Sequence, residues 1–112
     1  MKYYSEEEMK EIRLTFEEEI LAWPEVTTRK MFGCPCYKAD NKLFAFLVTG
    51  GVVLTKLSEP DRETLSNSFD TEPFQAGKKT IKNWPRVTVQ DKSELPKIIT
   101  FVEKSYKTAR NG

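Results

Sequence analysis

The sequence predicts a small α+β domain, in which an antiparallel β-meander is packed by an N-terminal and a C-terminal helix. Three observations predict this class. Apolar residues recur at helical spacing near both ends of the chain. The middle consists of short β-rich runs separated by turn residues, and Gly50-Gly51 joins two of these runs as in a tight hairpin. Helices at the ends with hairpin-linked strands between them are typical of α+β rather than alternating α/β domains.

The first helix is expected to begin at Ser5 and to end before Trp23-Pro24. Ser5 and Glu8 have the spacing of a capping box, which would satisfy free backbone N–H groups at the helix start. Proline disfavours helical geometry at the residue before it, so Pro24 ends the helix. The apolar stripe that faces the core is predicted to be Met9, Ile12, Phe16 and Ile20.

Four strands are expected next, over residues 26–32, 36–38, 43–49 and 52–57. Asp40-Asn41 supplies turn residues before the third strand, and Gly50-Gly51 supplies the positive φ angles of a tight turn after it. The third run is apolar on both faces. We therefore expect it to be central, with one face against the helices and the other covered at least in part.

The second half is expected to contain a short helix, an irregular segment, an edge strand and a long helix. Ser58 would cap a helix that reaches about Asn67. Residues 69–83 read as irregular because Pro73 and Gly77 interrupt any period, and residues 85–90 read as a short edge strand. Ser93 would cap the last helix, whose apolar stripe is Leu95, Ile98, Ile99, Val102 and Tyr106. No linker or repeat divides the chain, so residues 1–112 form one predicted domain whose core includes Phe16, Phe44, Phe46, Leu54, Ile98 and Val102.

Composition narrows the classes of function. The 112 residues are 31% charged, and no apolar run approaches the roughly 18 residues that cross a bilayer. Residues 1–6 lack the basic and then apolar layout of a signal peptide, so we expect a cytoplasmic protein without a membrane partner. The chain contains no histidine, which excludes histidine triads, histidine metal ligands and histidine acid–base chemistry.

The two cysteines, Cys34 and Cys36, flank Pro35 at the start of the expected second strand, so they lie on or beside it. Strand alternation places both thiols on one face. A redox pair would normally read Cys-x-x-Cys at a helix start, and a zinc site needs about four ligands. We therefore expect inert thiols, with no metal and no cofactor; four thiolates from two chains are the alternative.

Charge is distributed unevenly along the chain. Residues 6–19 carry seven acidic residues against two bases, whereas residues 77–110 carry nine bases against three acids. The stretch 78–86 could contact phosphates and stack a base on its tryptophan; alternatively, it is a solvated loop whose tryptophan packs inward. The sequence pI near 7.7 is below the strongly basic range of dedicated nucleic-acid binders, so this function is not favoured. The candidate nucleic-acid contacts are Lys78, Lys79, Lys82, Trp84 and Arg86.

Four short motifs, taken in order, resemble the N-terminal domain of the TfoX family of competence regulators. They are Arg29-Lys30-Met31-Phe32-Gly33, Lys42-Leu43-Phe44-Ala45-Phe46-Leu47, Val53-Leu54-Thr55-Lys56-Leu57 and Glu72-Pro73-Phe74. The resemblance extends from Thr27 to the last helix. It implies an α+β fold, shared with YjbR-like domains that are sometimes linked to DNA binding. Full-length competence regulators also carry a C-terminal domain, which lies outside this sequence.

Within these motifs, Arg29, Gly33, Cys34 and Cys36 form a candidate ligand or anion site. Alternatively, Arg29 is a half-buried strand residue that bonds to carbonyls or to a carboxylate such as Glu72. No complete catalytic site is visible in the sequence. The expected function is therefore a non-enzymatic, regulatory interaction module that acts through a protein partner or through self-association. Nucleic-acid binding and small-molecule binding are the alternatives.

Overall fold

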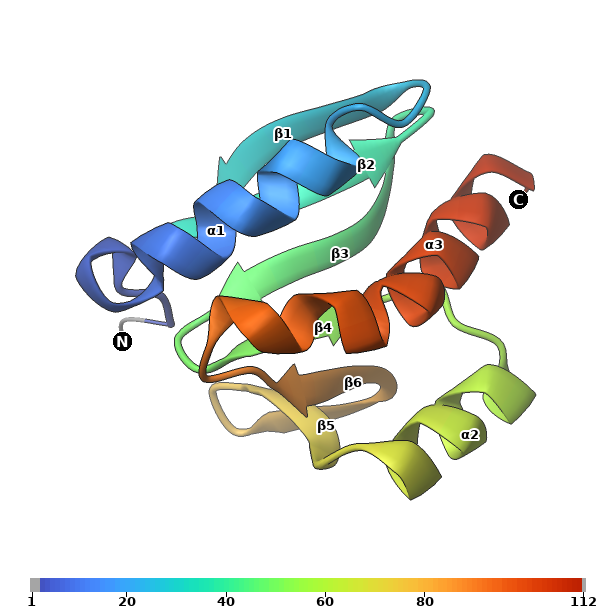
Figure 1. The fold of residues 1–112 in the computed structure, drawn as a ribbon. Helices are drawn as coiled ribbons and strands as arrows, with labels where there is room; N and C mark the ends of the chain where they lie inside the picture. The colour runs from blue at the N-terminus through green and yellow to red at the C-terminus, as the bar shows by residue number, and fades with distance from the viewer. Residues whose placement is uncertain (1–2, 112) are drawn as a thin grey trace.

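The computed structural model describes residues 3–111, which form three α-helices and one six-stranded antiparallel sheet. Met1 and Lys2, part of the stretch judged unlike a signal peptide, lie outside the described residues, as does Gly112. The helices α1 and α3 lie on one side of the sheet, and α2 lies beside β5 and β6 (Figure 1). The predicted α+β class is confirmed. The elements are α1 (Glu6–Ile20), β1 (Val26–Met31), β2 (Cys34–Ala39), β3 (Lys42–Val48), β4 (Gly51–Leu54), α2 (Glu59–Ser68), β5 (Thr71–Ala76), β6 (Lys79–Thr88), a short 3₁₀ turn η1 (Lys92–Glu94) and α3 (Leu95–Asn111).

The strand order is β1-β2-β3-β4-β6-β5, so only the first four strands form a simple meander. The segment expected to be irregular contains the edge strand β5, and β6 is a ten-residue strand between β4 and β5. The expectation of an irregular segment over residues 69–83 was therefore wrong, and so was the expectation of a short edge strand over residues 85–90. Pro73 lies at an irregularity of the edge strand, where a missing N–H is tolerated, and Gly77 lies in the β5–β6 turn with φ +63°.

Two of the three predicted helix caps differ from the structure. The Ser5 side chain makes no capping bond; instead its backbone N–H donates to Thr49 Oγ1 at 2.8 Å, which links the helix start to the β3–β4 turn. Ser58 does cap α2, because its Oγ accepts from the Asp61 N–H at 3.3 Å.

The last helix begins through η1, whose cap is Asp91 rather than Ser93. Asp91 accepts from the Ser93 N–H at 3.0 Å, and the Glu94 carboxylate accepts from the Asp91 N–H at 3.0 Å. These reciprocal bonds are a capping box, shifted by two residues from the expected position.

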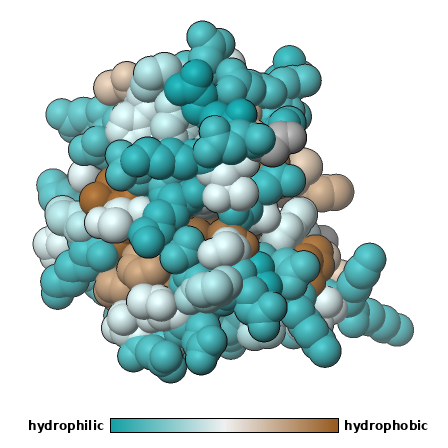
Figure 2. All heavy atoms as spheres, turned by 90° about the vertical axis from the view of Figure 1, so that its right-hand side faces the viewer, coloured by the Kyte–Doolittle hydropathy of each residue, from teal (hydrophilic) through white to brown (hydrophobic). Residues whose placement is uncertain are grey.

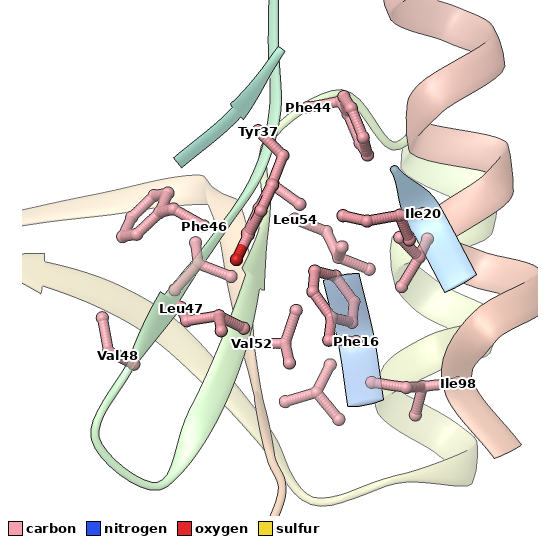
Figure 3. Packing of buried hydrophobic residues seen from close by; sticks show 14 of the residues in the cluster. Phe16, Ile20, Tyr37, Phe44, Phe46, Leu47, Val48, Val52, Leu54 and Ile98 are labelled. Atoms are coloured by element: carbon pink, nitrogen blue, oxygen red, sulfur yellow. The ribbon is translucent and has the colours of Figure 1, made fainter. Parts of the chain in front are cut away.

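The core lies on both sides of β3, because a bulge turns neighbouring phenylalanines to opposite faces. Tyr37 pairs with Ala45 while Lys38 pairs with Leu43, which leaves Phe44 as the extra residue of β3. Phe44 faces α3, whereas Phe46 points away from the helices (Figure 3). All six predicted core residues are buried, none with more than 3% of its surface exposed, so that prediction is confirmed.

A buried serine joins α3 to β3. The Ser105 hydroxyl is fully buried; it donates to the Phe44 carbonyl oxygen at 2.7 Å and accepts from the Lys56 N–H at 3.1 Å. The second bond gives the Lys56 N–H its partner, and the first adds to the bond that the Phe44 carbonyl oxygen accepts from the Thr55 N–H at 3.1 Å. Among residues 3–111, no helix combines the length and apolar character that crossing a bilayer requires.

Candidate functional site

The β1–β2 hairpin separates two hollows of the surface, one on each side of the sheet. On the helix side, a charged cleft of about 670 Å³ lies between α1 and β1. On the helix-free side, an aromatic groove of about 400 Å³ lies between the hairpin and strands β5 and β6. Both volumes are within the usual range of ligand sites, so the chemistry of the walls decides between them.

The aromatic groove has walls without a charged side chain. Its floor is a cluster of three rings: Phe46 meets Phe74 edge-to-face at 5.1 Å and Trp84 at 5.7 Å. Such ring pairs are favourable beyond the area they bury and hold the floor rigid. By contrast, the face of the molecule drawn in Figure 2 is mostly hydrophilic, with small separate apolar patches. The groove-lining residues are Tyr3, Met31, Phe32, Cys34, Phe46, Phe74, Ala76, Gly77, Ile81 and Trp84.

An irregularity of β6 places Trp84 in this groove. Pro73 pairs with Pro85, but the next residue of β5, Phe74, pairs with Ile81. Three residues of β6, 82–84, therefore have no partner on β5. Bulges of this kind redirect a side chain, and here the indole reaches across to Phe46 on β3.

The rim of the groove carries an exposed aromatic residue, Phe32, whose surface is 80% exposed. Phe32 has φ +55° and Gly33 has φ +78°, so both central residues of the two-residue β1–β2 turn are left-handed, as in a type I′ turn. A residue with a Cβ costs about 1–2 kcal/mol in this conformation. Phe32 therefore combines a strained backbone with an unburied ring.

The same sheet contains a turn that follows the ordinary rule. Asp40 and Asn41 join β2 to β3 with φ +50° and +68°, and Asn and Asp are residue types that tolerate left-handed geometry. The phenylalanine at the corresponding position of the β1–β2 turn serves neither the turn nor the core. An observed outlier of this kind is a reason to look for a function.

The charged cleft is lined by a closed hydrogen-bond network. Arg13 donates to both carboxylate oxygens of Glu6 at 2.8 Å and to Glu17 at 3.0 Å. The Tyr4 hydroxyl donates to Glu6 at 2.6 Å, and the buried Tyr37 hydroxyl donates to Glu17 at 2.7 Å. Both carboxylates already have charged or hydroxyl partners, so this network is best explained as the attachment of α1 to β2.

The network predicts an acid-sensitive contribution to stability. Hydrogen bonds from Arg13 and then Tyr4 lower the pKa of Glu6 from 4.5 to about 2. Because the folded pKa is the lower one, the stabilisation is complete above about pH 4.5 and is lost as pH falls toward 2. In urea unfolding, Glu6→Gln should destabilise the protein near neutral pH and differ less from the wild type at low pH.

The matched control is Glu7→Gln in the same helical turn, for which residues 3–111 supply no ion pair. It should change stability little at either pH, since exposed helix charges have small effects. A Glu6→Gln deficit that stays constant down to about pH 2 would contradict the pKa explanation.

The two cysteines are buried on the helix-free side of β2. Cys34 lines the aromatic groove, and Cys36 lies opposite Phe46 on β3, with 2% and 1% of their surfaces exposed. The shared face matches the expectation from alternation. Burial raises the pKa of the Cys36 thiol to about 11, and burial also raises the pKa of Cys34. Both thiols are therefore protonated and shielded near neutral pH.

We predict that both thiols react slowly in the folded protein. With Ellman's reagent, labelling should be about 100-fold slower than in urea-unfolded protein, because the thiolate is the reacting species. Single Cys34→Ser and Cys36→Ser variants assign the two rates. Fast labelling of either native thiol, or stoichiometric zinc in purified protein, would contradict the prediction of structural thiols.

The structure does not place Arg29 beside Glu72, as the alternative interpretation of Arg29 required. Arg29 is exposed on β1, and Glu72 lies on β5, the opposite edge of the sheet. Glu72 instead accepts from Arg86 at 2.9 Å. Of the candidate ligand site, Arg29 and Gly33 line the charged cleft, whereas Cys34 lines the aromatic groove.

The candidate nucleic-acid contacts do not form one surface. Trp84 is half-buried in the aromatic groove, and Arg86 is bound to Glu72 and to the Thr49 carbonyl oxygen at 3.2 Å. Lys82 faces a shallow hollow beside α2 that also contains acidic residues. Lys78 and Lys79 are exposed at the β5–β6 turn.

Among the described residues, no group of three or more cysteines and carboxylates is arranged to hold a metal ion. Sequence reasoning missed Tyr3, Phe32 and Phe74 as site residues. A signal for Phe32 was present, because a Phe-Gly pair between two β-rich runs is an unusual turn sequence.

Comparison with protein-family models, with curated proteins and with solved structures finds no match for this chain.

Proposed function

We propose that this chain is a non-enzymatic interaction domain that binds a protein partner in the aromatic groove. The observation that carries the proposal is Phe32, which is 80% exposed in a left-handed conformation beside a groove of about 400 Å³. The ring of Phe32 adds nothing to the core, and a phenylalanine is not a residue type that this turn favours. Exposed aromatic side chains next to apolar pockets are the usual anchors of protein interfaces.

The proposal keeps three expectations drawn from the sequence. The resemblance to the TfoX N-terminal domain, a regulatory role and a cytoplasmic location remain part of it. An interaction domain fits the resemblance, which implies regulation rather than a defined reaction. None of these is needed for the groove to bind, so the experiments below address the groove directly.

The test uses an uncharged probe, the peptide acetyl-Ser-Phe-Ser-Trp-Ser-amide, in an NMR titration of ¹⁵N-labelled protein. We expect saturable shifts at Met31, Cys34, Ala76 and the Trp84 indole, with a Kd of about 1 mM or tighter. Short peptides with two rings make few contacts, so an affinity in this range is realistic.

Two variants distinguish the groove from other apolar surface. Phe32→Asn should stabilise the fold by about 1 kcal/mol, because asparagine tolerates the left-handed turn, and should weaken binding severalfold. Leu14→Asn removes a residue that is 48% exposed on α1 and should leave binding unchanged. Absence of shifts at about 2 mM peptide, or equal binding by Phe32→Asn, would refute the proposal.

Nucleic-acid binding is the alternative function, and we predict that it is weak and unspecific. Lys78 and Lys79 can contact phosphates, but the described surface has no helix or ribbon with a polar cluster for reading base edges. Titration with random and selected duplexes at physiological salt should give no Kd tighter than about 10⁻⁷ M. Tighter binding with a clear sequence preference would favour the alternative.

A further inference from the structure

We infer that the partner segment is acidic: it carries an aromatic or large apolar anchor flanked by aspartate or glutamate. This inference rests on the proposed function and specifies the chemistry of the partner. It follows from the charges that surround the groove rather than from the groove itself.

Lysines extend from the rim formed by the β5–β6 turn. Ala76 lines the groove and pairs with Lys79, and paired residues of antiparallel strands project from the same face. Lys79 therefore projects from the groove side of the sheet. Lys78 follows Gly77, another groove-lining residue, and both lysines are exposed. No ion pair joins either lysine to a carboxylate within residues 3–111.

Carboxylates near the groove in sequence already have partners. Glu72, two residues before Phe74, is bound to Arg86 at 2.9 Å. Glu6, close to Tyr3 in the chain, is bound to Arg13 at 2.8 Å. The exposed Lys78 and Lys79 therefore contribute positive charge at this rim without an ion-pair partner among residues 3–111, which favours a negatively charged segment and disfavours a basic one.

A second copy of the chain is the main competing occupant. The outer surface of α1 is acidic and exposes Leu14, and Leu21, the residue that caps the end of α1, is exposed seven residues further along. That surface lies on the helix side of the sheet, so its insertion into the groove of another copy would be head-to-tail. Such contacts form open chains unless the rotation closes. We therefore commit to a separate acidic partner and include self-association in the test.

The experiment compares three peptides that share the same rings: acetyl-Glu-Glu-Phe-Glu-Trp-Glu-amide and its all-glutamine and all-lysine versions. The glutamate peptide should bind about fivefold more tightly than the glutamine peptide at low salt, and the lysine peptide most weakly. The preference should shrink as salt rises, because exposed charges are screened.

Charge reversal assigns the preference to the rim. In Lys78→Glu/Lys79→Glu, the advantage of the glutamate peptide should disappear while the glutamine peptide binds as before. The matched control is Lys10→Glu/Lys97→Glu, which makes the same charge change on α1 and α3. If this control loses the preference equally, net charge rather than the groove rim is responsible, and the inference is wrong.

The outcomes separate the inference from the proposed function. Equal binding of all three peptides would overturn the acidic partner and leave the groove as a binding site. Binding of none, together with no shift from the uncharged probe, would overturn both. Light scattering tests self-association. If the wild type forms concentration-dependent oligomers and Phe32→Asn does not, a second copy occupies the groove and the inference of a separate partner is wrong.

Discussion

Replacing Phe44 with alanine is expected to lower the free energy of unfolding by about 3–5 kcal/mol, a large fraction of the about 5–15 kcal/mol of a typical domain. The ring is fully buried and meets Tyr106 of α3 edge-on at 5.5 Å. Its own carbonyl oxygen accepts from Ser105, so β3 and α3 are fixed to each other beside the cavity. Because β3 and α3 are held in place, they can move little into the cavity that the Phe44→Ala variant would leave.

The matched control is Phe32→Ala, the same chemical change at a ring that is 80% exposed. Its effect in urea denaturation should lie within about 0.5 kcal/mol, because little apolar area leaves the core. A loss below about 1 kcal/mol for Phe44→Ala would show that α3 does not pack on β3 as described.

Phe44 illustrates which parts of the fold the sequence predicts well. The stripes of α1 and α3 and the doubly apolar run of β3 are local periodic signals, and each predicts the right element. All four stripe residues of α1 are buried, whereas in α3 Ile99 is only partly buried and the buried Ser105 and Ala109 were not expected. The second face of β3 was also expected to be covered. Phe74 and Trp84 provide that cover, against Phe46.

The prediction failed where the fold depends on residues far apart in sequence. The β5–β6 hairpin is held by pairing with β4 and by an irregularity that skips three residues, and neither feature has a local sequence pattern. Pro73 and Gly77 were read as breakers of structure, although an edge strand and a turn accommodate them. The Ser5 cap failed for a similar reason, because Thr49 lies 44 residues away in sequence.

The candidate site was only partly accessible to sequence reasoning. Cys34 and Trp84 had been assigned to two different sites, and the structure brings them to one groove. Their proximity depends on the bulge in β6, so the chain gave no reason to combine them. Phe32 differs: it was expected to end the first strand, but β1 ends at Met31 and Phe32 lies in the β1–β2 turn. Its Phe-Gly turn sequence and its aromatic chemistry are both local features. An aromatic residue in a two-residue turn is a site signal that can be read directly.

The Gly50-Gly51 pair shows that one sequence signal can have two physical causes. Both glycines were expected to supply positive φ angles to the turn, but only Gly50 does, with φ +80°. Gly51 is the first residue of β4 and pairs with Thr88 of β6. A Cβ atom at Gly51 would lie 2.7 Å from the Val87 carbonyl oxygen, so its requirement is the close approach of two backbones.

Gly51→Ala is therefore expected to destabilise the protein by about 1–3 kcal/mol, because the β4 and β6 backbones must move apart. Gly33→Ala is the comparison: it has φ +78° and no atom within 4 Å of an added Cβ, so its cost of about 1–2 kcal/mol is conformational.

Amide hydrogen exchange separates the two mechanisms. Gly51→Ala should accelerate exchange along the β4–β6 ladder, at Val52, Val53 and Val87, beyond what the global loss of stability explains, whereas Gly33→Ala should not. Equal, uniform acceleration in both variants would mean that β4 and β6 adapt to the methyl group without separating, and that the glycine at position 51 is not required for their contact.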